Sequence, residues 1–356
     1  MKKILFVISN LKVGGGAEKS VTMLAKGLSK FYDVEVLTFY DFEDEYELSV
    51  NRESFGYSYS NSLFVKAWRL LVRIPFLLRK FLKKKDYDLV VANASDANIP
   101  CLLAKRWLLD YPLWTVIRNN VFDNKHPYYR FRNLHRFADK RVALTEALSR
   151  KVPYSCVAIG NALDLEEVRS LWDADVEEQE LFSKKTIVMV GRLASQKNHK
   201  WFFDVFASLE EDVNLLVIGS GPLEEELKAY AANIPGIHFL GVKKNVYAYL
   251  RKADVFVLPS LFEGMPRVLM EALACGAVCV VNDCETGPRE LLGVGLDEQI
   301  NSYKKTDYGY LVPFNDKEQF VAATKQALKQ RKQPAADTRF GLEEISKRWK
   351  HEISIS

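Results

Sequence analysis

Two acidic residues in the second half of the chain stand at a spacing that suits the binding of sugar hydroxyls. Glu263 and Glu271 follow an apolar run, 255–258, that is typical of a buried parallel strand. Pro266 suits the first turn of a helix, so Glu263 is predicted in the strand-to-helix loop and Glu271 on the second helical turn. Carboxylates at that place accept hydrogen bonds from sugar or ribose hydroxyls. The alternative is one carboxylate favoured by the helix dipole and one solvated helix glutamate.

Two cations precede these glutamates and could hold a diphosphate. Arg192 and Lys197 follow the apolar run 187–190 and flank the expected start of a helix. The free N–H groups of a helix start bind anions, and two neighbouring cations would complete a diphosphate clamp. Because open α/β sheets bind ligands at the carboxyl ends of their strands, the cations and the two glutamates are predicted to meet at one sheet edge.

A glycine-rich loop stands near the start of the chain. Gly14, Gly15 and Gly16 follow the apolar run 4–8 and precede a helix, and Glu18 stands on the first turn of that helix. Glycine lets a backbone approach a phosphate closely, although a simple tight turn explains the same residues. The pattern is not GxGxxG, and no clean acidic residue ends the next strand, which argues against a nicotinamide cofactor.

Further polar residues follow two more predicted strands of the first half. Residues 93–98 form a polar loop after the run 89–92, and Arg118 follows the run 113–117. These positions are candidates for the carboxyl edge of the first sheet. A lone arginine there equally fits a structural ion pair.

The stretch 63–85 has eight basic residues, fourteen apolar residues and no acidic residue. Such an amphipathic helix indicates contact with an anionic membrane surface. Five of its cations are predicted on one helical face: Lys66, Arg69, Arg73, Lys80 and Lys84. Pro75 should kink or divide the helix. A helix packed on the sheet with Trp68 and Phe76 in the core is the alternative. No nucleic-acid-binding module surrounds the stretch, so a nucleic-acid partner is not expected.

Charge and cysteine content restrict the class of protein. The net charge of +4 divides into +10 for residues 1–160 and −6 for the remainder, so the two halves are expected to bind different partners. The five cysteines include no CxxC pair, which fits a reduced, cytosolic chain without a zinc site. The acidic pair Asp173 and Asp175 resembles a metal-binding DxD only in its letters, because no strand precedes it. Apolar run 4–8 is too short for a signal peptide, and no run of 18 apolar residues predicts a membrane span.

Strands and helices alternate along the whole chain, which predicts two doubly wound α/β domains. We place the first domain at 1–162 and the second at 163–337. A last helix at about 338–352 is expected to pack back on the first domain. Residues 41–62 read as an irregular insertion, residues 161–185 as the connection between domains, and the polar loop 293–308 has no assigned role.

The motifs of the second half form an ordered set. They are Gly-Arg-Leu at 191–193, Gln-Lys-Asn at 196–198, Gly-Ser-Gly-Pro-Leu at 219–223, Phe-Leu-Gly at 239–241, Ala-Asp at 253–254, and Glu-Gly at 263–264 with a glutamate eight positions later. Together with the first glycine loop, this set resembles the retaining family 4 glycosyltransferases of the GT-B fold. The resemblance implies two Rossmann-like domains facing a central cleft. Thr286-Gly-Pro-Arg-Glu290 and the stretch 63–85 resemble bacterial enzymes that extend lipid-linked oligosaccharides.

The resemblance also implies roles for individual residues. Arg192, Lys197 and Glu263 correspond to the catalytic group. Donor binding corresponds to Gly15, Gly16, Gly191, Gly221, Val246, Gly264, Met265, Pro266, Arg267 and Glu271. Candidates on the acceptor side are Glu18, Arg118, Asn119, Asn120 and His126. Many relatives carry a histidine where Asn119 stands, so His126 is the available substitute.

The expected activity is the transfer of a hexose or N-acetylhexosamine from a nucleotide sugar to a polyprenyl-diphosphate-linked saccharide. A UDP-linked donor, retention of configuration, independence of metals and other cofactors, and a peripheral site on the cytoplasmic membrane face are expectations of the same resemblance. One alternative is a related GT-B enzyme with a soluble product, such as an epimerase or a glycogen-synthase-like transferase. Another is a non-catalytic membrane-bound sensor of sugar or nucleotide. The complete set of Arg192, Lys197, Glu263 and Glu271 argues against the sensor.

Overall fold

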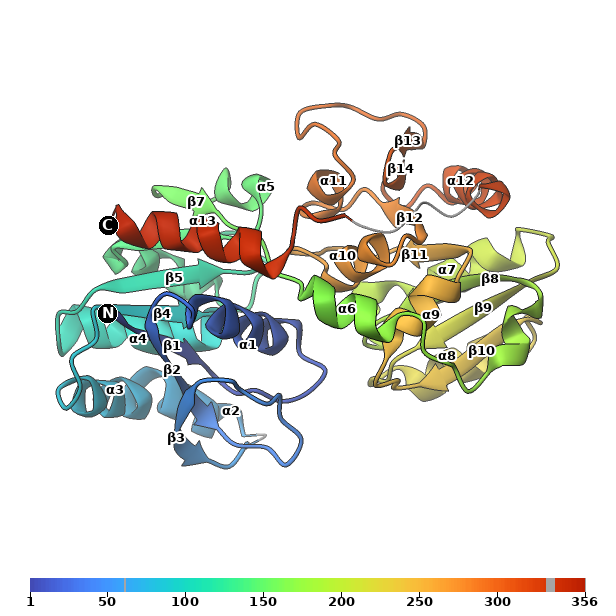
Figure 1. Ribbon diagram of the computed structural model, residues 1–356. Helices are drawn as coiled ribbons and strands as arrows, with labels where there is room; N and C mark the ends of the chain where they lie inside the picture. Colours follow the sequence, from blue (N-terminus) through green and yellow to red (C-terminus); the bar gives the residue numbers. More distant parts are fainter. Residues whose placement is uncertain (61, 331–336, 356) are drawn as a thin grey trace. The chain divides into compact units, whose positions relative to one another are not determined.

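The computed structural model describes residues 1–60, 62–330 and 337–355, and it divides the chain into two compact units (Figure 1). The first unit contains residues 1–162 and 341–356, and the second contains residues 163–340. The first unit is therefore built from both ends of the chain. Each unit has its own sheet and core, as the alternation of strands and helices predicts, and the fold class is confirmed.

The sheet of the first unit has seven strands in the order β3-β2-β1-β4-β5-β6-β7, and every neighbouring pair is parallel. The strands are β1 (Lys3–Ile8), β2 (Asp33–Tyr40), β3 (Asn51–Tyr57), β4 (Leu89–Asn93), β5 (Leu113–Ile117), β6 (Lys140–Ala143) and β7 (Cys156–Ala158). The central strands are buried and largely apolar, as expected for a parallel sheet whose two faces are covered by helices.

Helices of the first unit pack on its sheet in two groups. They are α1 (Gly16–Leu28), α2 (Leu63–Trp68), the π-helical η1 (Arg69–Arg73), α3 (Ile74–Leu82), α4 (Ser95–Trp107), the 3-10 helix η2 (Tyr129–Phe137), α5 (Glu146–Ser149) and α13 (Leu342–Ser354). Helices α3 and α4 share a core with β1, β2 and β4. Helix α13 lies against α1, and its buried Trp349 stacks on Trp114 at 5.9 Å between ring centroids. The last helix thereby completes the first unit.

The sheet of the second unit has the order β10-β9-β8-β11-β12-β14-β13. Its strands are β8 (Lys185–Val190), β9 (Val213–Ile218), β10 (Ile237–Gly241), β11 (Val255–Leu258), β12 (Val278–Asn282), β13 (Lys304–Thr306) and β14 (Gly309–Val312). Its helices are α6 (Leu165–Leu171), η3 (Gln179–Ser183), η4 (Ser195–Lys197), α7 (His199–Ala207), α8 (Glu224–Ala231), α9 (Val246–Lys252), α10 (Arg267–Ala274), α11 (Pro288–Leu291) and α12 (Lys317–Lys329). Helices α7, α8 and α12 share one core with the strands.

Two segments that had no assigned regular structure contribute strands. Within 41–62, residues 51–57 form β3, a parallel edge strand on β2, so the prediction of an irregular insertion is wrong. The alternation of polar and small residues in β3 is weak. The charge of its Arg52 is neutralised by nearby carboxylates, because Arg52 donates to Asp41 at 2.6 Å and also pairs with Glu45. Within 293–308, β13 adds an antiparallel strand to β14.

The stretch 63–85 remains helical through Pro75, although its geometry changes. The π-helical η1 ends at Arg73, two residues before Pro75, and Ile74 keeps helical angles (φ −63°, ψ −43°). A wider turn ahead of the proline accommodates its ring and its missing N–H, so the predicted division takes the form of a π-helical turn. Within the described residues no helix has the length and apolarity that a bilayer crossing requires.

The strand orders locate one special position in each sheet. Counting outward from β1, the first sheet runs to β2 and β3 on one side and to β4 and the later strands on the other. The order reverses between β1 and β4, and in the second sheet between β8 and β11. Open α/β sheets bind ligands outside the carboxyl ends of the strands at such a reversal. The loops that leave these four strands are therefore the places to look for a site.

Candidate active site

The loops after β8 and β11 pack directly on each other in the second unit. The Leu261 amide donates to the Gln196 carbonyl at 2.8 Å, and the Gln196 side chain donates to the Phe262 carbonyl at 2.8 Å. This packing brings Lys197 Nζ to 2.7 Å from Glu263 Oε1, with 16% and 8% of the side chains exposed. Two of the predicted catalytic residues, 66 positions apart, thus form one ion pair at the strand-order reversal.

Three glycines make the approach of the loops possible. A Cβ on Gly191 would lie 3.1 Å from Lys197 Cε, and a Cβ on Gly219 would lie 2.1 Å from the Gly191 carbonyl oxygen. Gly219 also has φ +136°, which side-chain-bearing residues rarely adopt. A Cβ on Gly221 would lie 2.4 Å from the Leu193 carbonyl oxygen. Gly191 and Gly221, predicted to bind the donor, therefore both have a packing role in forming the loops.

A second ion pair lies on the first turns of α10. Arg267 Nε is 3.1 Å from Glu271 Oε1, and the two side chains are 10% and 9% exposed. Glu271 is on the second turn, as predicted, while Pro266 is the N-cap residue and not the first helical residue. Glu271 is therefore held by Arg267 and is not the solvated glutamate of the alternative.

The loop after β12 supports Glu263 from a third side. Thr286 Oγ1 donates a hydrogen bond to the Glu263 carbonyl. A Cβ on Gly287 would lie 2.5 Å from the Gly264 carbonyl oxygen and 2.8 Å from Pro266 Cδ. The motif Thr286–Glu290 thus fixes the backbone that carries Glu263.

The remaining donor-side candidates differ in their exposure. Arg192 is exposed, and within the described residues its side chain has no hydrogen bond or ion pair. Val246 opens α9, where the Asn245 side chain accepts from the amides of Tyr247 at 3.1 Å and Ala248 at 3.4 Å. Met265 is buried beneath the loop. Arg192 is therefore available to a ligand, while Lys197 and Arg267 are already paired.

A network of asparagines under these loops has no counterpart in the sequence prediction. Buried Asn282, the last residue of β12, donates to the Pro259 carbonyl at 3.1 Å, and its Oδ1 accepts from the Asn315 amide at 3.2 Å. Asn198 donates to Asn315 Oδ1 at 3.3 Å. Asn198 and Asn315 have φ +58° and +56°, a conformation that asparagine tolerates. An asparagine that ends an apolar strand was the available signal.

His199 follows this network and is buried beside the site. Burial and the charge of Lys197 lower its pKa to about 4. The imidazole is therefore neutral at physiological pH and adds no charge to the loop.

In the first unit, the structure brings Glu18 and Arg118 into one polar neighbourhood. A Cβ on Gly15 would lie 1.9 Å from Glu18 Oε2, so the carboxylate folds back over the start of α1. Burial raises the pKa of Glu18, and the nearby Arg118 charge opposes that rise. Arg118 donates to Asn93 Oδ1 at 3.1 Å and to Asn161 Oδ1 at 3.2 Å. Gly16 is the first residue of α1, and a Cβ at this position would meet no atom within 4 Å.

The other acceptor-side candidates shape the turn after β5. Asn120 Oδ1 accepts from the Phe122 amide at 3.2 Å, and His126 Nδ1 accepts from the Tyr128 amide at 3.2 Å. Burial lowers the pKa of His126. Asn119 is exposed, and its carbonyl accepts from the Val121 amide at 2.8 Å. These contacts give the three residues a local structural role.

The predicted membrane-contact cations lie along α2, η1 and α3, with one exception. Lys66 Nζ is 2.7 Å from the Tyr59 hydroxyl, Arg69 donates to the Ser58 carbonyl at 2.7 Å, and Arg73 donates to the Tyr57 hydroxyl. Lys80 is exposed on α3. Lys84 lies beyond the end of α3 at Leu82, so it is not on the helical face where it was predicted.

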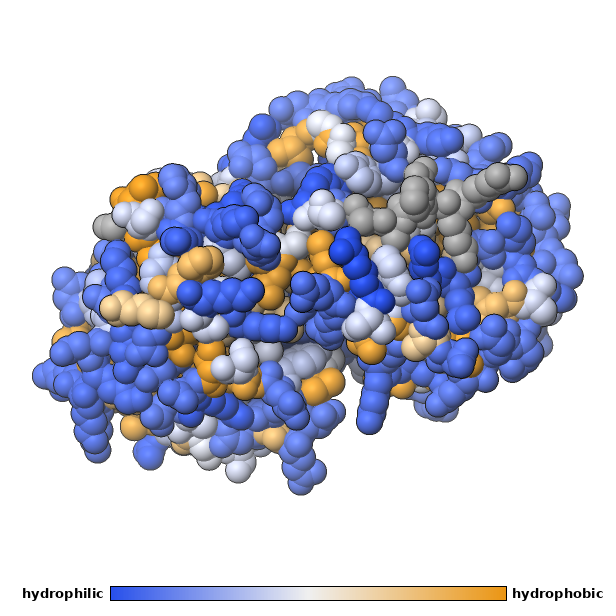
Figure 2. All heavy atoms as spheres, in the orientation of Figure 1, coloured by the Kyte–Doolittle hydropathy of each residue, from blue (hydrophilic) through white to orange (hydrophobic). Residues whose placement is uncertain are grey.

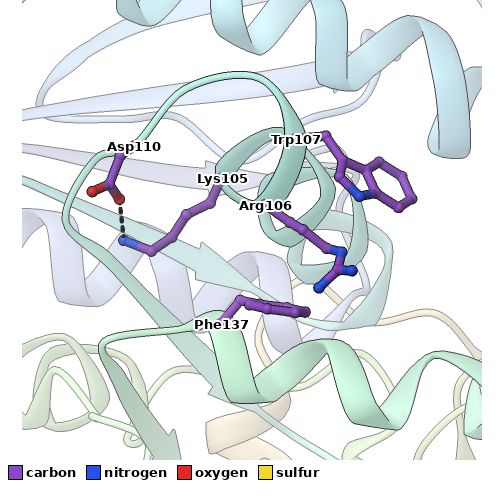
Figure 3. Close-up of a pocket in the computed structure, with 5 residues that line it drawn as sticks. All are labelled: Lys105, Arg106, Trp107, Asp110 and Phe137. Carbon is purple, nitrogen blue, oxygen red and sulfur yellow. Dashed lines mark hydrogen bonds and ion pairs between the residues drawn. The ribbon is translucent and has the colours of Figure 1, made fainter.

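The structure also contains a hollow of about 450 Å³ at the opposite edge of the first sheet. It is lined by Lys105, Arg106, Trp107, Asp110 and Phe137 (Figure 3). Lys105 Nζ is 3.0 Å from Asp110 and 2.9 Å from Asp139, and Arg106 lies over the Phe137 ring at 4.4 Å. The hollow is at the C-terminal end of α4, away from the carboxyl end of β4, and none of the predicted site residues lines it.

The residues that the structure describes contain no group of three histidine, cysteine or acidic side chains that could hold a metal ion. Asp173 of the acidic pair instead accepts from the Trp172 indole at 2.9 Å. Independence of metals remains a prediction.

Comparison with known proteins gives matches in both units. Residues 14–153 match the family model described as Glycosyltransferase Family 4, and residues 184–330 match the model described as glycosyl transferases group 1. A protein of Campylobacter jejuni, GalNAc-α-(1→4)-GalNAc-α-(1→3)-diNAcBac-PP-undecaprenol α-1,4-N-acetyl-D-galactosaminyltransferase, is 30% identical over 328 residues, which cover 86% of this chain and 88% of that protein. The UDP-Gal:α-D-GlcNAc-diphosphoundecaprenol α-1,3-galactosyltransferase of Escherichia coli is 28% identical over 275 residues, which cover 69% and 67%.

Solved structures share the fold at lower sequence identity. The apo form of the lipopolysaccharide outer core galactosyltransferase WaaB has a TM-score of 0.71 at 18% identity, with 99% of both chains covered. The Anabaena protein HepE in complex with UDP and glucose has a TM-score of 0.71 at 18% identity, with 100% of both chains covered. At this identity the likeness shows the fold alone.

Proposed function

The chain belongs to glycosyltransferase family 4 and is a hexosyltransferase, and from this premise we propose its substrates: a UDP-linked hexose or N-acetylhexosamine as donor, and a saccharide on a polyprenyl diphosphate as acceptor. The observation that carries the proposal is the Lys197–Glu263 ion pair, 2.7 Å long, at the reversal of strand order in the second unit. A cation and a carboxylate held together there match the diphosphate and the sugar hydroxyls of one nucleotide sugar.

The donor would be held by charge and by hydrogen bonds. Exposed Arg192 and partly buried Lys197 would bind the diphosphate and stabilise the negative charge that grows on it as the sugar leaves. Glu263 would accept from sugar hydroxyls, and Glu271, held by Arg267, would accept from ribose hydroxyls. Since these cations lie where a metal would otherwise neutralise the diphosphate, we propose transfer without a metal. We also propose retention of configuration, with a leaving diphosphate oxygen taking the acceptor proton.

The acceptor class rests on the relatives. The names of the C. jejuni and E. coli proteins include saccharides linked to undecaprenol diphosphate. Each of the two alignments covers more than two thirds of this chain. A lipid-linked acceptor requires the enzyme to work at a bilayer, so we propose peripheral attachment to the inner face of the cytoplasmic membrane.

An exposed apolar segment in the first unit supports attachment to a membrane. Large apolar side chains are exposed at Tyr59, Leu63, Phe64, Trp68, Val72 and Phe76. The face that Figure 2 shows is mostly hydrophilic, with smaller hydrophobic areas. Exposed apolar side chains gathered in one segment are typical of an interaction site. Trp68 and Phe76 are 45% and 56% exposed, which contradicts the alternative that they belong to the core. Cations beside exposed apolar groups fit a surface of anionic lipid.

Turnover tests the proposal directly. Purified protein would be incubated with UDP-, GDP- and ADP-sugars and short-chain polyprenyl-diphosphate saccharides, and products would be identified by mass spectrometry. We expect transfer from a UDP-sugar that persists in EDTA, with an anomeric configuration by NMR that matches the donor. Transfer to free saccharides alone would instead support the soluble-product enzyme. Nucleotide binding without transfer to any acceptor would overturn the proposal in favour of a sensor.

A further inference from the structure

The first unit has its own reversal of strand order, between β1 and β4, and a buried amide lies there. Asn93 is the last residue of β4 and is 1% exposed. Arg118 donates to its Oδ1 at 3.1 Å, which fixes the orientation of the amide because an arginine can only donate. Its Nδ2 is buried and has no hydrogen-bond partner among the described residues. A buried donor without a partner is costly to the fold, and it is typical of a place that a ligand completes.

The amide is held from behind by a chain of contacts. Arg118 also donates to Asn161 Oδ1 at 3.2 Å, and Asn161 Oδ1 accepts from Ser20 Oγ at 2.8 Å. Asn161 and Ser20 are both buried. Asn93 therefore cannot turn its amide to satisfy Nδ2 without breaking the contact with Arg118.

The backbone after Asn93 is strained in the same place. Ala94 has φ +68° and ψ +162°, a combination that belongs almost entirely to glycine. It forms the N-cap of α4, and no side chain caps that helix. Strain in a strand-to-helix junction over a buried unpaired donor is typical of a binding site.

Two carboxylates lie near this junction. Asp96, on the first turn of α4, accepts a hydrogen bond from the Tyr128 hydroxyl. Glu18 lies close enough that Asp96 raises its pKa and Arg118 lowers it, after the larger effect of burial. One cation and two carboxylates make this junction unsuited to a phosphate. A donor amide beside two acceptor carboxylates instead matches sugar hydroxyls, which both donate and accept.

The surroundings connect this place to the exposed apolar segment. Burial and the neighbouring Asp96 carboxylate raise the pKa of Tyr128, and Tyr40 and Tyr59 lie near the same hydroxyl. Tyr40 and Tyr59 pack edge to face at 6.0 Å between ring centroids, and Tyr59 contacts Lys66 of α2. A saccharide bound at Asp96 would thus lie on the side of the unit that carries the proposed membrane contact.

We propose that Asn93, Asp96 and Glu18 form a subsite for the terminal sugar of the lipid-linked acceptor. Asn93 Nδ2 donates to a hydroxyl oxygen of the sugar ring, and the two carboxylates accept from hydroxyl protons. Arg118 is a positioning residue that holds the Asn93 amide. This inference rests on the proposed function, because it assigns the acceptor to this edge.

The test uses Asn93→Asp, which keeps the oxygen that accepts from Arg118 and removes the donor. We expect the KM for the acceptor to rise at least ten-fold, while the KM for the UDP-sugar and the affinity for UDP stay within two-fold. Asn124→Asp, an exposed asparagine in the same unit, is the matched control and should leave both values unchanged. Acceptors lacking one hydroxyl at a time extend the test. The analogue without the contacted hydroxyl should bind wild type and Asn93→Asp about equally.

Three outcomes would overturn the subsite. A rise in KM for the donor instead of the acceptor would place the donor sugar there. Competition by inorganic phosphate or methylene diphosphonate that Asn93→Asp abolishes would make it an anion site. Unchanged kinetics in a variant with a normal unfolding midpoint would leave Asn93 with a structural role. Saturation-transfer NMR with the free saccharide separates this inference from the function: binding lost in Asn93→Asp supports the subsite even if wild type shows no transfer.

Discussion

Lys197 would interact with two anionic groups, Glu263 and the diphosphate, if the donor binds as proposed. Its ammonium lies 2.7 Å from Glu263 in the free protein, and the incoming diphosphate would compete for the same charge. The ion pair therefore orients both groups before the donor arrives. Because the lysine is only 16% exposed, its charge acts in a partly desolvated place, where it stabilises a developing anion more than it would in water.

Removing Lys197 should lower turnover strongly. We expect Lys197→Ala to reduce kcat about 100- to 1,000-fold, the usual effect of deleting one preorganised group aimed at a leaving group. Steady-state kinetics with saturating acceptor measure it. The control is Lys200→Ala, which removes an exposed lysine whose partner, Glu226, is 4.0 Å away. Near-normal kinetics for both Lys197→Ala and Glu271→Ala would show that the site is misplaced.

A methyl group added at Gly219 should test the close contact between the loops that contain Gly191 and Gly219. Gly219→Ala puts a Cβ 2.1 Å from the Gly191 carbonyl oxygen at φ +136°. We expect it to lower the free energy of unfolding of the second unit by roughly 2 kcal/mol or more, since neither backbone can move away freely. Urea denaturation measures the loss. Gly295→Ala, whose Cβ would meet nothing closer than 3.7 Å, should be nearly neutral; equal losses in both variants would contradict the argument.

At the residue scale, the sequence predicts which residues lie at the site better than it predicts which residues they contact. Lys197 and Glu263 stand beside apolar runs that end abruptly, so their place at a sheet edge is predictable. Their contact with each other depends on which strands are neighbours, and no local pattern encodes that order. Asn282 was not predicted, and Asn93 was predicted only as part of the polar loop 93–98, for a related reason. Each ends a strand with an amide whose partners come from distant loops.

Among the elements of the first sheet, a buried carboxylate joins three neighbouring segments. Glu35 of β2 pairs with Lys3 of β1 at 2.9 Å and with Lys85 at 2.9 Å, and it accepts from the Tyr87 hydroxyl at 2.6 Å. Burial alone would oppose its ionisation, but the hydrogen bonds from Tyr87, Lys3 and Lys85 outweigh burial and lower the pKa of Glu35 to about 2.

The sign of the pH effect follows from that shift. A carboxyl with a lowered pKa in the folded state adds stability above its unfolded value of 4.5, and the contribution is lost as the pH falls through the interval from 4.5 to about 2. We expect Glu35→Gln to lower the free energy of unfolding at pH 7 by up to about 3 kcal/mol. The difference between variant and wild type should shrink below pH 4, as urea titrations at several pH values would show. A difference that is independent of pH would indicate lost packing instead of lost charge.

The segment from α2 to α3 should bind vesicles by both charge and apolar contact. We expect binding to anionic vesicles to weaken as salt rises from low to physiological concentration, because added salt shortens the range of surface charge interactions to about 10 Å. Trp68→Ala combined with Phe76→Ala should weaken binding several-fold at every salt concentration. Val242→Ala, an apolar side chain in the second unit that is 70% exposed, is the control in the same sedimentation assay. Binding that ignores both salt and the double variant would place the contact elsewhere.

Prediction at the element scale succeeded where periodicity was strong. The apolar strands β1, β4, β8 and β11 and the helices that follow them are encoded by local pattern. The edge strand β3 was missed because its residues alternate weakly and are polar, and its parallel register comes from β2. The π-helical turn before Pro75 was missed because the helical periodicity on both sides of it continues.

At the scale of the whole molecule, the chain leaves the first unit, forms the second unit and returns to the first. The first unit is closed by α13, which follows the entire second unit in sequence. The second unit is one continuous segment, 163–340, inserted between two parts of the first. The alternation of strands and helices was sufficient to predict two sheets. The docking of α13 depends on contacts of Trp349 with Phe6 and Trp114, which are far from it in the sequence.

A perturbation of either unit should therefore register separately in hydrogen exchange. UDP at saturating concentration is expected to slow exchange in the loops 191–198 and 259–266, because a ligand that binds only the native state stabilises the parts it contacts. Trp349→Ala removes a side chain that is 2% exposed, and we expect it to destabilise the first unit by about 3 kcal/mol and to speed exchange in β1, β5 and α13. The variant should still show the protection by UDP in the second unit. If UDP slowed no amide in these two loops, the donor site as built here would be wrong. If Trp349→Ala sped exchange equally in both units, they would unfold as one cooperative body, and the expectation that the second unit unfolds separately from the first would be wrong.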